Sequence, residues 1–220
     1  MSPVKSFTES KGHNPDNIRK ILEMAIFAKP VEDADTAITQ IWTTTGGLTV
    51  PTGYLPIGLV TKGDGASWSR DQESSDVESF GYAEPTRSDI TKDVTGLGFT
   101  MQETKKNVME MHHGLDLSSV TTDADGNFFF DKASRPAQRK YRILAIGKDG
   151  DGPDAIYVAR WLPNAKVTEN GEQAWSEGDE IKYPATLSGY TDAKFGTSFR
   201  EIWGGPGLDH AAMGFPAPGV

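Results

Sequence analysis

Two adjacent histidines are the residues of this chain that could most readily bind a metal ion. His112 and His113 follow Glu110 in a stretch with helical spacing. Neighbouring side chains on a helix point about 100° apart, so the two imidazoles do not converge on one ion, and an H-E-x-x-H spacing is absent. A histidine at the end of a helix instead interacts favourably with the negative pole of the helix dipole. We therefore predict a helix end here and no metal site.

An acidic turn superficially resembles a calcium-binding loop. Its sequence runs from Asp123 through Asp125 and Gly126 to Asn127. The glycine comes too early for a twelve-residue calcium loop, and the closing glutamate is missing. Aspartate, glycine and asparagine are also the usual residues of tight turns. We predict a hairpin turn at this position and another at the glycine-rich run 149–154.

Nucleophilic catalysis has no convincing candidate in the sequence. Ser67 lies in the run GASWS, which lacks the glycine that follows the serine in a nucleophile elbow. Glycine loops that cradle phosphates are absent as well. We therefore predict that the protein is not an enzyme and uses no cofactor. Trp68, Trp161 and Trp175 leave one alternative open, a monomeric β-sandwich module that binds a ligand such as a carbohydrate.

Composition narrows the class of protein further. The chain has 220 residues, enough for one domain with arms, and it contains no cysteine, which excludes disulfides and thiolate metal sites. A formal net charge of −9 argues against a protein that binds nucleic acid tightly. With 24 Gly and 13 Pro, the composition favours many short strands and turns. No apolar run approaches the ~18 residues that span a bilayer, and no leader is evident, so we expect a soluble protein without membrane insertion.

We expect the stretch from Ser74 to Gly114 to contain the strand and the helix around which the rest of the chain is organised. Residues 97–101 alternate between apolar and small or polar side chains, which predicts a strand with one buried face. From Glu103 the apolar spacing changes to that of one helix face, formed by Thr104, Val108, Met111 and Leu115. Gly114 is placed to end this helix in a left-handed cap.

Alternation elsewhere predicts a mainly antiparallel β fold, a sandwich or a barrel, with one packed α-helix. We predict strands at residues 38–44, 54–61, 66–70, 139–147, 155–162, 166–169, 180–190 and 195–203. Residues 139–147 and 155–162, joined by the turn at 149–154, form the clearest hairpin that the sequence predicts. At the N-terminus, Asn14 and Pro15 and the apolar spacing that follows favour a helix reaching about Phe27, with an extended segment near 25–29.

Several motifs occur in a characteristic order along the chain. They are LPIGLVTKGDG, then SSDVESFG, EPTRSDITKDVTGLGFTMQETKKNVMEMHHG, WSEGDEIKYPATLSGY and REIWGGPG, and together they cover roughly Leu55 to Gly207. This order resembles the major tail, or tail-tube, proteins of long flexible-tailed bacteriophages with siphovirus morphology, in particular those of actinobacterial hosts. Members of that family more often have a strand at the position of AIFAKP, which competes with the helix expected there. The family's appended immunoglobulin-like module has no counterpart before Val220.

The resemblance implies a structural virion protein. Such proteins form six-subunit rings that stack into a hollow tube, assembled in the host cytoplasm and incorporated into the virion tail. A β-barrel shared by all subunits lines the lumen, through which DNA passes without specific binding. The implied partners are other copies of the chain and the tape measure, terminator and distal tail proteins. The implied domains are an N-terminal arm at residues 1–16, a tube domain at 17–203 and a C-terminal arm at 204–220.

The resemblance also assigns roles to surfaces. Polar strand faces are candidates to line the lumen, and their residues are Asp89, Thr91, Asp93, Glu180, Lys182, Thr186 and Ser188. The segment from Ser74 to Arg87 is expected to be a loop that touches the adjacent ring, with the candidates Asp76, Glu78, Tyr82, Glu84, Pro85 and Arg87. Acidic groups facing the lumen would repel DNA phosphate.

Overall fold

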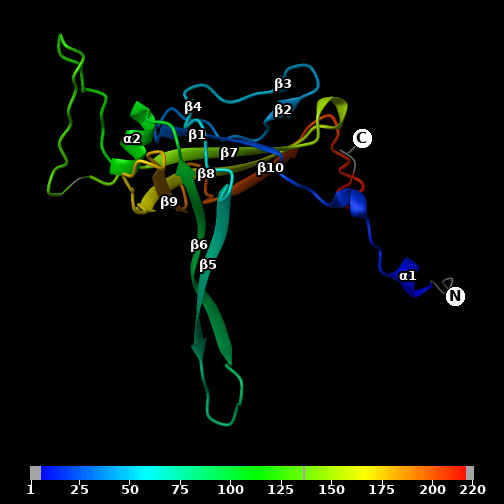
Figure 1. Ribbon diagram of the computed structural model, residues 1–220. Helices are drawn as coiled ribbons and strands as arrows, with labels where there is room; N and C mark the ends of the chain where they lie inside the picture. Colours follow the sequence, from blue (N-terminus) through cyan, green and yellow to red (C-terminus); the bar gives the residue numbers. More distant parts are fainter. Residues whose placement is uncertain (1–5, 136, 217–220) are drawn as a thin grey trace.

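The computed structural model describes residues 6–135 and 137–216 (Figure 1). Its helical elements are α1 Phe7–Ser10, the 3-10 turns η1 Pro15–Asn17 and η2 Gly152–Asp154, and α2 Lys106–His113. Its strands are β1 Glu23–Pro30, β2 Trp42–Thr43, β3 Gly47–Leu48, β4 Leu55–Pro56, β5 Ala66–Val77, β6 Arg87–Met101, β7 Tyr141–Asp149, β8 Ile156–Glu169, β9 Tyr183–Gly189 and β10 Arg200–Gly204. No helix among the described residues has the length and hydropathy needed to cross a membrane.

Eight strands form one antiparallel sheet in the order β4-β1-β7-β8-β9-β6-β5, with β10 pairing the first half of β8. The β7–β8 hairpin confirms the pairing expected for residues 139–162. The remaining pair, β2 and β3, forms a small separate ribbon above β7 (Figure 1). The prediction of a mainly antiparallel β fold with one packed helix is confirmed.

Residues 55–61 join the two sides of this sheet. At one end β4 pairs with β1, and the Ile57 N–H donates to the carbonyl of Ile26 at 3.0 Å. At the other end Val60 bridges to Met101, and the N–H of Gln102 donates to the carbonyl of Leu59 at 3.0 Å. Because this segment bonds to β1 and to β6, the strands from β1 to β6 curl into a barrel. The strand expected at 54–61 is therefore present as two short pairings rather than one ladder.

The barrel interior is one apolar core that α2 covers at one end. Its fully buried side chains come from six strands or strand-like segments and from the helix, and they include Ile26, Ile57, Leu97, Met101, Val108, Ile143, Leu162 and Leu187. Gly114 ends α2 with φ 66°, the left-handed cap expected from the sequence. The apolar alternation in residues 97–101 is likewise confirmed, since Leu97, Phe99 and Met101 are all buried.

A second core lies on the outer face of β7 and β8. The segment 31–54 crosses this face and packs Ile38 and Ile41 against Leu144, Ala159 and Trp161. The Trp161 indole N–H donates to the Tyr54 hydroxyl at 2.8 Å, and burial raises the pKa of Tyr54 to about 12. Strand β7 is consequently buried on both faces, which explains its continuous apolar run.

Beside the second core lies a buried network of charges. Arg142, only 2 % exposed, forms ion pairs with Asp35 and with Asp192 at 2.9 Å, and it donates to the Pro163 carbonyl at 2.6 Å. Lys29 forms a further ion pair with Asp35. The network therefore fastens two loops, 31–36 and 190–199, to β7.

Hydrogen bonding sets the ionisation of Asp35. Burial by itself would raise the pKa of this carboxyl, but the hydrogen bonds from Lys29 and Arg142 outweigh burial and hold the pKa below its usual value. A lowered pKa in the folded state contributes stability above the pKa of the unfolded chain. That contribution is lost as pH falls through the lower folded value.

The N-terminal helix expected to reach Phe27 is wrong. Only the turn η1 is helical, with the Asn14 side chain accepting from the Asp16 N–H at 3.1 Å. Beyond it the chain is extended, because the Leu22 N–H donates to the Lys148 carbonyl and β1 then pairs with β7 over eight residues. This pairing with a distant strand outweighs the local helical spacing.

Removing the buried arginine tests whether the charge network stabilises the fold. We expect Arg142→Leu to lower the free energy of unfolding by about 3–5 kcal/mol, because Asp35 and Asp192 would lose their shared partner while staying buried. Urea unfolding followed by circular dichroism measures the loss. The control is Arg70→Leu, which breaks the exposed ion pair with Asp93 and should leave the midpoint nearly unchanged. Equal losses in the two variants would contradict the assignment.

Candidate functional site

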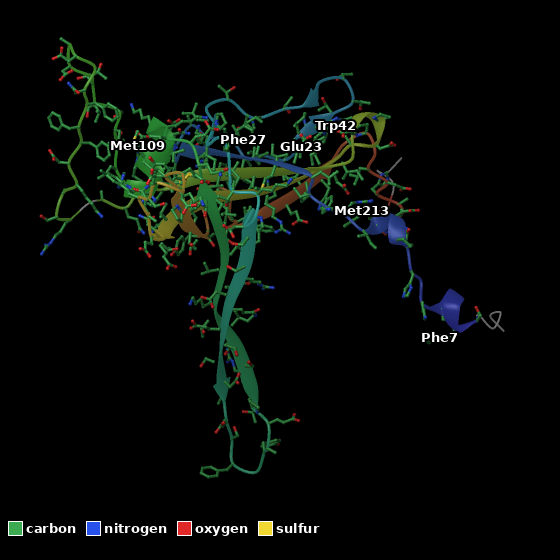
Figure 2. All side chains as sticks on the ribbon, in the orientation of Figure 1. Phe7, Glu23, Phe27, Trp42, Met109 and Met213 are labelled. Atoms are coloured by element: carbon green, nitrogen blue, oxygen red, sulfur yellow. The ribbon has the colours of Figure 1, made fainter. Side chains whose placement is uncertain are left out.

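The β5–β6 hairpin is the feature that sets this fold apart from a plain barrel. The two strands pair from Ala66↔Phe99 to Val77↔Arg87, but β9 joins β6 only between Thr95 and Met101. Beyond Thr95 the hairpin is a two-stranded ribbon that projects away from the body (Figure 1). Its side chains extend into open space on both faces (Figure 2). A two-stranded ribbon in water is marginally stable, so this half of the hairpin is suited to contact another molecule.

A smooth polar face lies at the root of the hairpin, on the side of β5, β6 and β9 opposite the core. It consists of small side chains from neighbouring strands, namely Ser67, Ser69, Gly96, Gly98, Thr186 and Ser188. Strand β8 adds Thr168, whose hydroxyl lies 3.2 Å from that of Ser188. We call these seven residues the polar face. None of them is charged, so the face offers hydrogen-bonding groups but no strong binding point for a polyanion.

Charged residues lie at both ends of the polar face. Toward the hairpin, Lys92 forms ion pairs with Asp71 at 2.7 Å and Glu73 at 2.8 Å. At the far end, Glu180 accepts a hydrogen bond from Gln102 at 2.9 Å, which is the main reason that its pKa is lowered. Lys182 lies 3.6 Å from the same carboxylate.

The predicted lumen candidates divide into two groups in the structure. Thr186 and Ser188 belong to the polar face, and Glu180 and Lys182 continue it just before β9 begins at Tyr183. The three candidates on β6 do not share one face, because the strand register shifts between Lys92 and Ile90 and leaves Thr91 unpaired as a bulge. Their predicted contact with the lumen remains a prediction.

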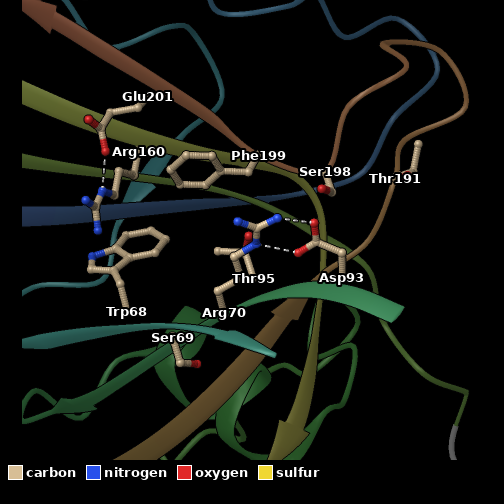
Figure 3. A pocket seen from close by; sticks show the side chains of 10 residues that line it. All are labelled: Trp68, Ser69, Arg70, Asp93, Thr95, Arg160, Thr191, Ser198, Phe199 and Glu201. Carbon is tan, nitrogen blue, oxygen red and sulfur yellow. Dashed lines mark hydrogen bonds and ion pairs between the residues drawn. The ribbon is translucent and has the colours of Figure 1, made fainter. Parts of the chain in front are cut away.

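Asp93 turns toward a groove instead of the polar face. Arg70 donates two hydrogen bonds to its carboxylate, at 2.8 and 2.6 Å, and these bonds lower the pKa of Asp93 (Figure 3). On the other wall, Arg160 lies 5.0 Å from the Trp68 ring and donates to Glu201 at 2.7 Å. The groove has a volume of about 700 Å³. Because both arginines are already paired with carboxylates, the groove has no free charge with which to hold an ionic ligand.

The expected inter-ring loop, Ser74 to Arg87, is a loop only in its central part, and both of its ends are strand. Asp76 lies in β5 and Arg87 begins β6, so only residues 78–86 form the turn between them. Residues 71–76 are polar on both faces of β5, so their sequence shows no alternation that would have predicted the strand. Glu78, Tyr82, Glu84 and Pro85 form the exposed tip. Their contact with an adjacent ring remains a prediction.

The residues considered for chemistry have structural roles. The His112 side chain is buried against Tyr183. The pKa of His113 is lowered, mainly by burial and further by the nearby His112 and Lys132. The Asp123 carboxylate accepts from the N–H groups of Asp125 and Asn127, which confirms a turn, although no paired strands flank it. No group of His, Asp and Glu in residues 6–135 and 137–216 is arranged to hold a metal ion.

The tryptophans do not form a carbohydrate platform. Trp161 is completely buried, Trp175 is 81 % exposed on a separate segment, and Trp68 lies beneath Arg160 in the groove. A sugar-binding platform needs exposed aromatic faces close together, and these three side chains do not provide one.

The terminal segments meet near η1, and α1 lies beyond this point, away from the body (Figure 1). The Asn17 side chain donates to the Ala212 carbonyl at 2.7 Å, and the Gly207 N–H donates to the Ala155 carbonyl at 3.1 Å. Phe7 and Phe215 remain exposed (Figure 2 labels Phe7). The assignment of these segments as inter-subunit arms remains a prediction, and residues 1–5 and 217–220 lie outside the described chain.

Comparison with known proteins places the chain in a structural context. A family model described as phage tail tube protein matches residues 11–200. A solved structure titled as the sheath–tube complex of the PVC extracellular contractile injection system in its extended state is similar, with a TM-score of 0.41 and 9 % sequence identity. That match covers 91 % of this chain and 99 % of the other. No curated protein matches the sequence.

The close packing of the polar face can be tested at Gly96. A Cβ atom added there would collide with the Ser69 hydroxyl oxygen, whereas the Ser69 Cβ lies at an ordinary 3.7 Å. We expect Gly96→Ala to lower the free energy of unfolding by about 1 kcal/mol. In a Ser69→Ala background the same change should be neutral or stabilising, because alanine restricts the unfolded strand more than glycine does. A double-mutant cycle by urea unfolding measures the coupling, and additive effects would contradict the collision.

Proposed function

The chain belongs to the phage tail tube protein family, and we propose that its copies form six-subunit rings that stack into the tube of a long flexible tail. Family membership makes it a structural component of the virion tail and not an enzyme. Tail tube proteins act by assembling with one another, so the functional site is the set of surfaces that meet in the tube.

The free edge of β5 is the observation that carries the ring proposal. Strand β5 pairs with β6 along all its length and ends the sheet, so its other edge presents unpaired N–H and C=O groups from Ala66 to Val77. Such an edge invites pairing with a strand of another chain. In a closed ring every copy makes the same head-to-tail contact, and each free edge is paired. The ring then replaces the missing third strand of the projecting hairpin.

We assign the polar face to the lumen of the tube. Its serine, threonine and glycine residues carry no charge, and the acidic residues at its two ends are mostly held as ion pairs. Six copies at −9 each contribute −54 formal charges to a ring. A lumen lined by uncharged polar groups, in a ring whose net charge is negative, repels DNA phosphate weakly and offers it no binding site. The genome therefore slides through during ejection. The lumen candidates Asp89, Thr91, Glu180 and Lys182 extend the face at its ends.

Contacts between rings are assigned to the hairpin tip and to the terminal arms. The tip at residues 78–86 is the part of the described chain that projects furthest from the body (Figure 1). The C-terminal arm is bonded through the Ala212 carbonyl to Asn17, the residue that follows the N-terminal arm, and the two arms present exposed Phe7 and Phe215. The motif order that resembles flexible-tailed phages of actinobacteria supports a siphovirus tail in such a host. The tape measure, terminator and distal tail proteins are the proposed partners at the ends of the tube.

Truncation of the N-terminal arm tests its part in assembly. We expect a chain lacking residues 1–14 to remain folded, because the barrel begins at Glu23, and to form no tubes. Negative-stain electron microscopy and light scattering of the purified full chain should show rings or tubes with a central hole. Truncated protein that forms tubes of normal length would overturn the arm assignment and leave the ring proposal standing.

Charge reversal in the proposed lumen tests the sliding argument. In virions built with Asp89→Lys and Glu180→Lys, we expect DNA ejection to slow severalfold, because the introduced ammonium groups attract passing phosphates. The rate of DNA release at several salt concentrations is the measurement, and added salt should relieve the delay. Glu177→Lys and Asp33→Lys, both exposed and outside the residues assigned to the lumen and to ring contacts, provide the control. Unchanged ejection in the lumen variant would contradict the assignment.

A further inference from the structure

We propose that the tip of the β5–β6 hairpin of one copy docks onto the exposed phenylalanines and free basic residues of the loop after α2 in a second copy. This contact rests on the proposed stacking of rings and names the surface that receives the tip. We call Val77, Glu78, Phe80, Tyr82 and Glu84 the tip surface. We call Phe128, Phe129, Lys132, Arg135 and Lys140 the receiving surface.

The tip surface presents aromatic rings from an ordered turn. Phe80 is fully exposed and Tyr82 is 73 % exposed, which leaves both rings without a cover in the single chain. The turn is nevertheless fixed by its own bonds, since the Thr86 N–H donates to the Val77 carbonyl at 2.8 Å and the Ser79 and Thr86 hydroxyls lie 2.9 Å apart. Exposed aromatic side chains on a fixed element are typical of residues that anchor an interface.

The charge of the tip surface is negative and unneutralised. The nearest basic residues are already paired. Arg87 forms an ion pair with Asp89, with 2.6 Å between Nε and Oδ2, and Lys92 forms ion pairs with Asp71 and Glu73. Within the described part of the chain, Glu78 and Glu84 of the tip surface form no ion pair, and neither does the neighbouring Asp76. An occupant for this tip must therefore cover aromatic rings and also supply positive charge.

The receiving surface has both properties. Phe130 packs on His113, with 5.4 Å between ring centres, and this contact fixes the loop while Phe128 and Phe129 stay exposed, Phe129 by 83 %. The chain then carries basic residues and no acidic residue between Asp131 and Tyr141. Arg139 is occupied by Glu110 and Asp116, whereas Lys132, Arg135 and Lys140 are exposed and form no ion pair with the described residues.

Other exposed aromatic surfaces do not match the tip. Trp175 lies among acidic residues that would repel it, namely Glu172, Glu177, Asp179 and Glu180. The Phe7 ring already lies 4.9 Å from the ammonium of Lys11. Near Phe215 the described chain contains Asp209 and no Lys or Arg. In the groove, both arginines are paired with carboxylates.

The two surfaces cannot meet within one chain. The tip lies at the end of the projecting hairpin, and the loop that carries the receiving surface rises from the opposite side of the body (Figure 1). A contact between two different surfaces of identical chains is heterologous, and repeated along an axis it builds an open stack. The direction of the hairpin then fixes which end of each ring faces the next.

Cysteine cross-linking tests the contact directly, because the chain has no cysteine of its own. The variant Ala83→Cys plus Ala133→Cys places one thiol at each surface, and both positions are exposed. Under mild oxidation during assembly we expect a ladder of disulfide-linked chains on non-reducing gels. A mixture of the two single variants should give dimers that contain one chain of each. Either single variant alone should give few dimers. Tubes that form normally without cross-links in the double variant would overturn the proposed contact but not the ring proposal.

Charge exchange provides the second test. We expect Glu78→Lys with Glu84→Lys to reduce the yield of sedimentable tubes about tenfold, and Lys132→Glu with Arg135→Glu to do the same, because each creates like charges across the contact. The chain with all four changes should recover tubes. Circular dichroism verifies that each variant is folded, and Glu177→Lys is the control.

Failure of the four-fold variant to recover tubes, with its fold intact, would overturn the pairing. A wild-type chain that forms neither rings nor tubes, even with tail initiators, would instead overturn the proposed function.

Discussion

Strand β6 extends beyond the barrel, because β9 pairs with only its second half, and much of the structure follows from this mismatch in length. Its fifteen residues extend over roughly 50 Å at the usual rise of a strand. The second half, from Thr95, has β9 on one side and β5 on the other and carries core side chains. The first half has β5 alone. One half of β6 therefore packs in the barrel core, and the other half extends out of the barrel as part of the projecting hairpin. A free edge on β5, an exposed tip and a polar face at the root all result from this division.

The sequence predicted those elements whose periodicity comes from a single core face. Residues 97–101 and the odd positions of β9 were found by alternation, and α2 was found by its apolar spacing and Gly114. Polar residues on both faces hid the outer half of the hairpin, so residues 74–87 appeared to be a loop. At the N-terminus the error was the reverse, because the apolar spacing of Ile18, Ile21 and Leu22 predicted a helix that does not form. These side chains are exposed, and the pairing of this segment with β7, more than a hundred residues later, decides its conformation.

The buried charge network was missed because its members are scattered along the sequence. Asp35, Arg142 and Asp192 meet only when β7 forms and two loops fold over it. One signal was present, an arginine inside the otherwise apolar run YRILAIG, since a buried arginine requires carboxylate partners. By fixing the loops 31–36 and 190–199 to β7, the network completes the covering of the outer face. The barrel wall is consequently covered on both faces where β7 and β8 lie.

The hydrophobic cores are completed within one copy, so the surfaces left for assembly lie outside them, and this bears on how a tube is built in one direction. The core residues are buried within one copy, whereas the free β5 edge, the tip surface and the receiving surface all lie outside it. Main-chain bonds along an edge are insensitive to side-chain identity, so an edge alone would pair in several registers. Aromatic and charged contacts are specific but individually weak. In the proposed tube the edge supplies most of the bonding within a ring, and the tip, fitting a differently charged surface of another copy, selects register and polarity. Separating strength from specificity lets single chains remain dispersed until a ring presents several receiving surfaces at once, because linked contacts act together.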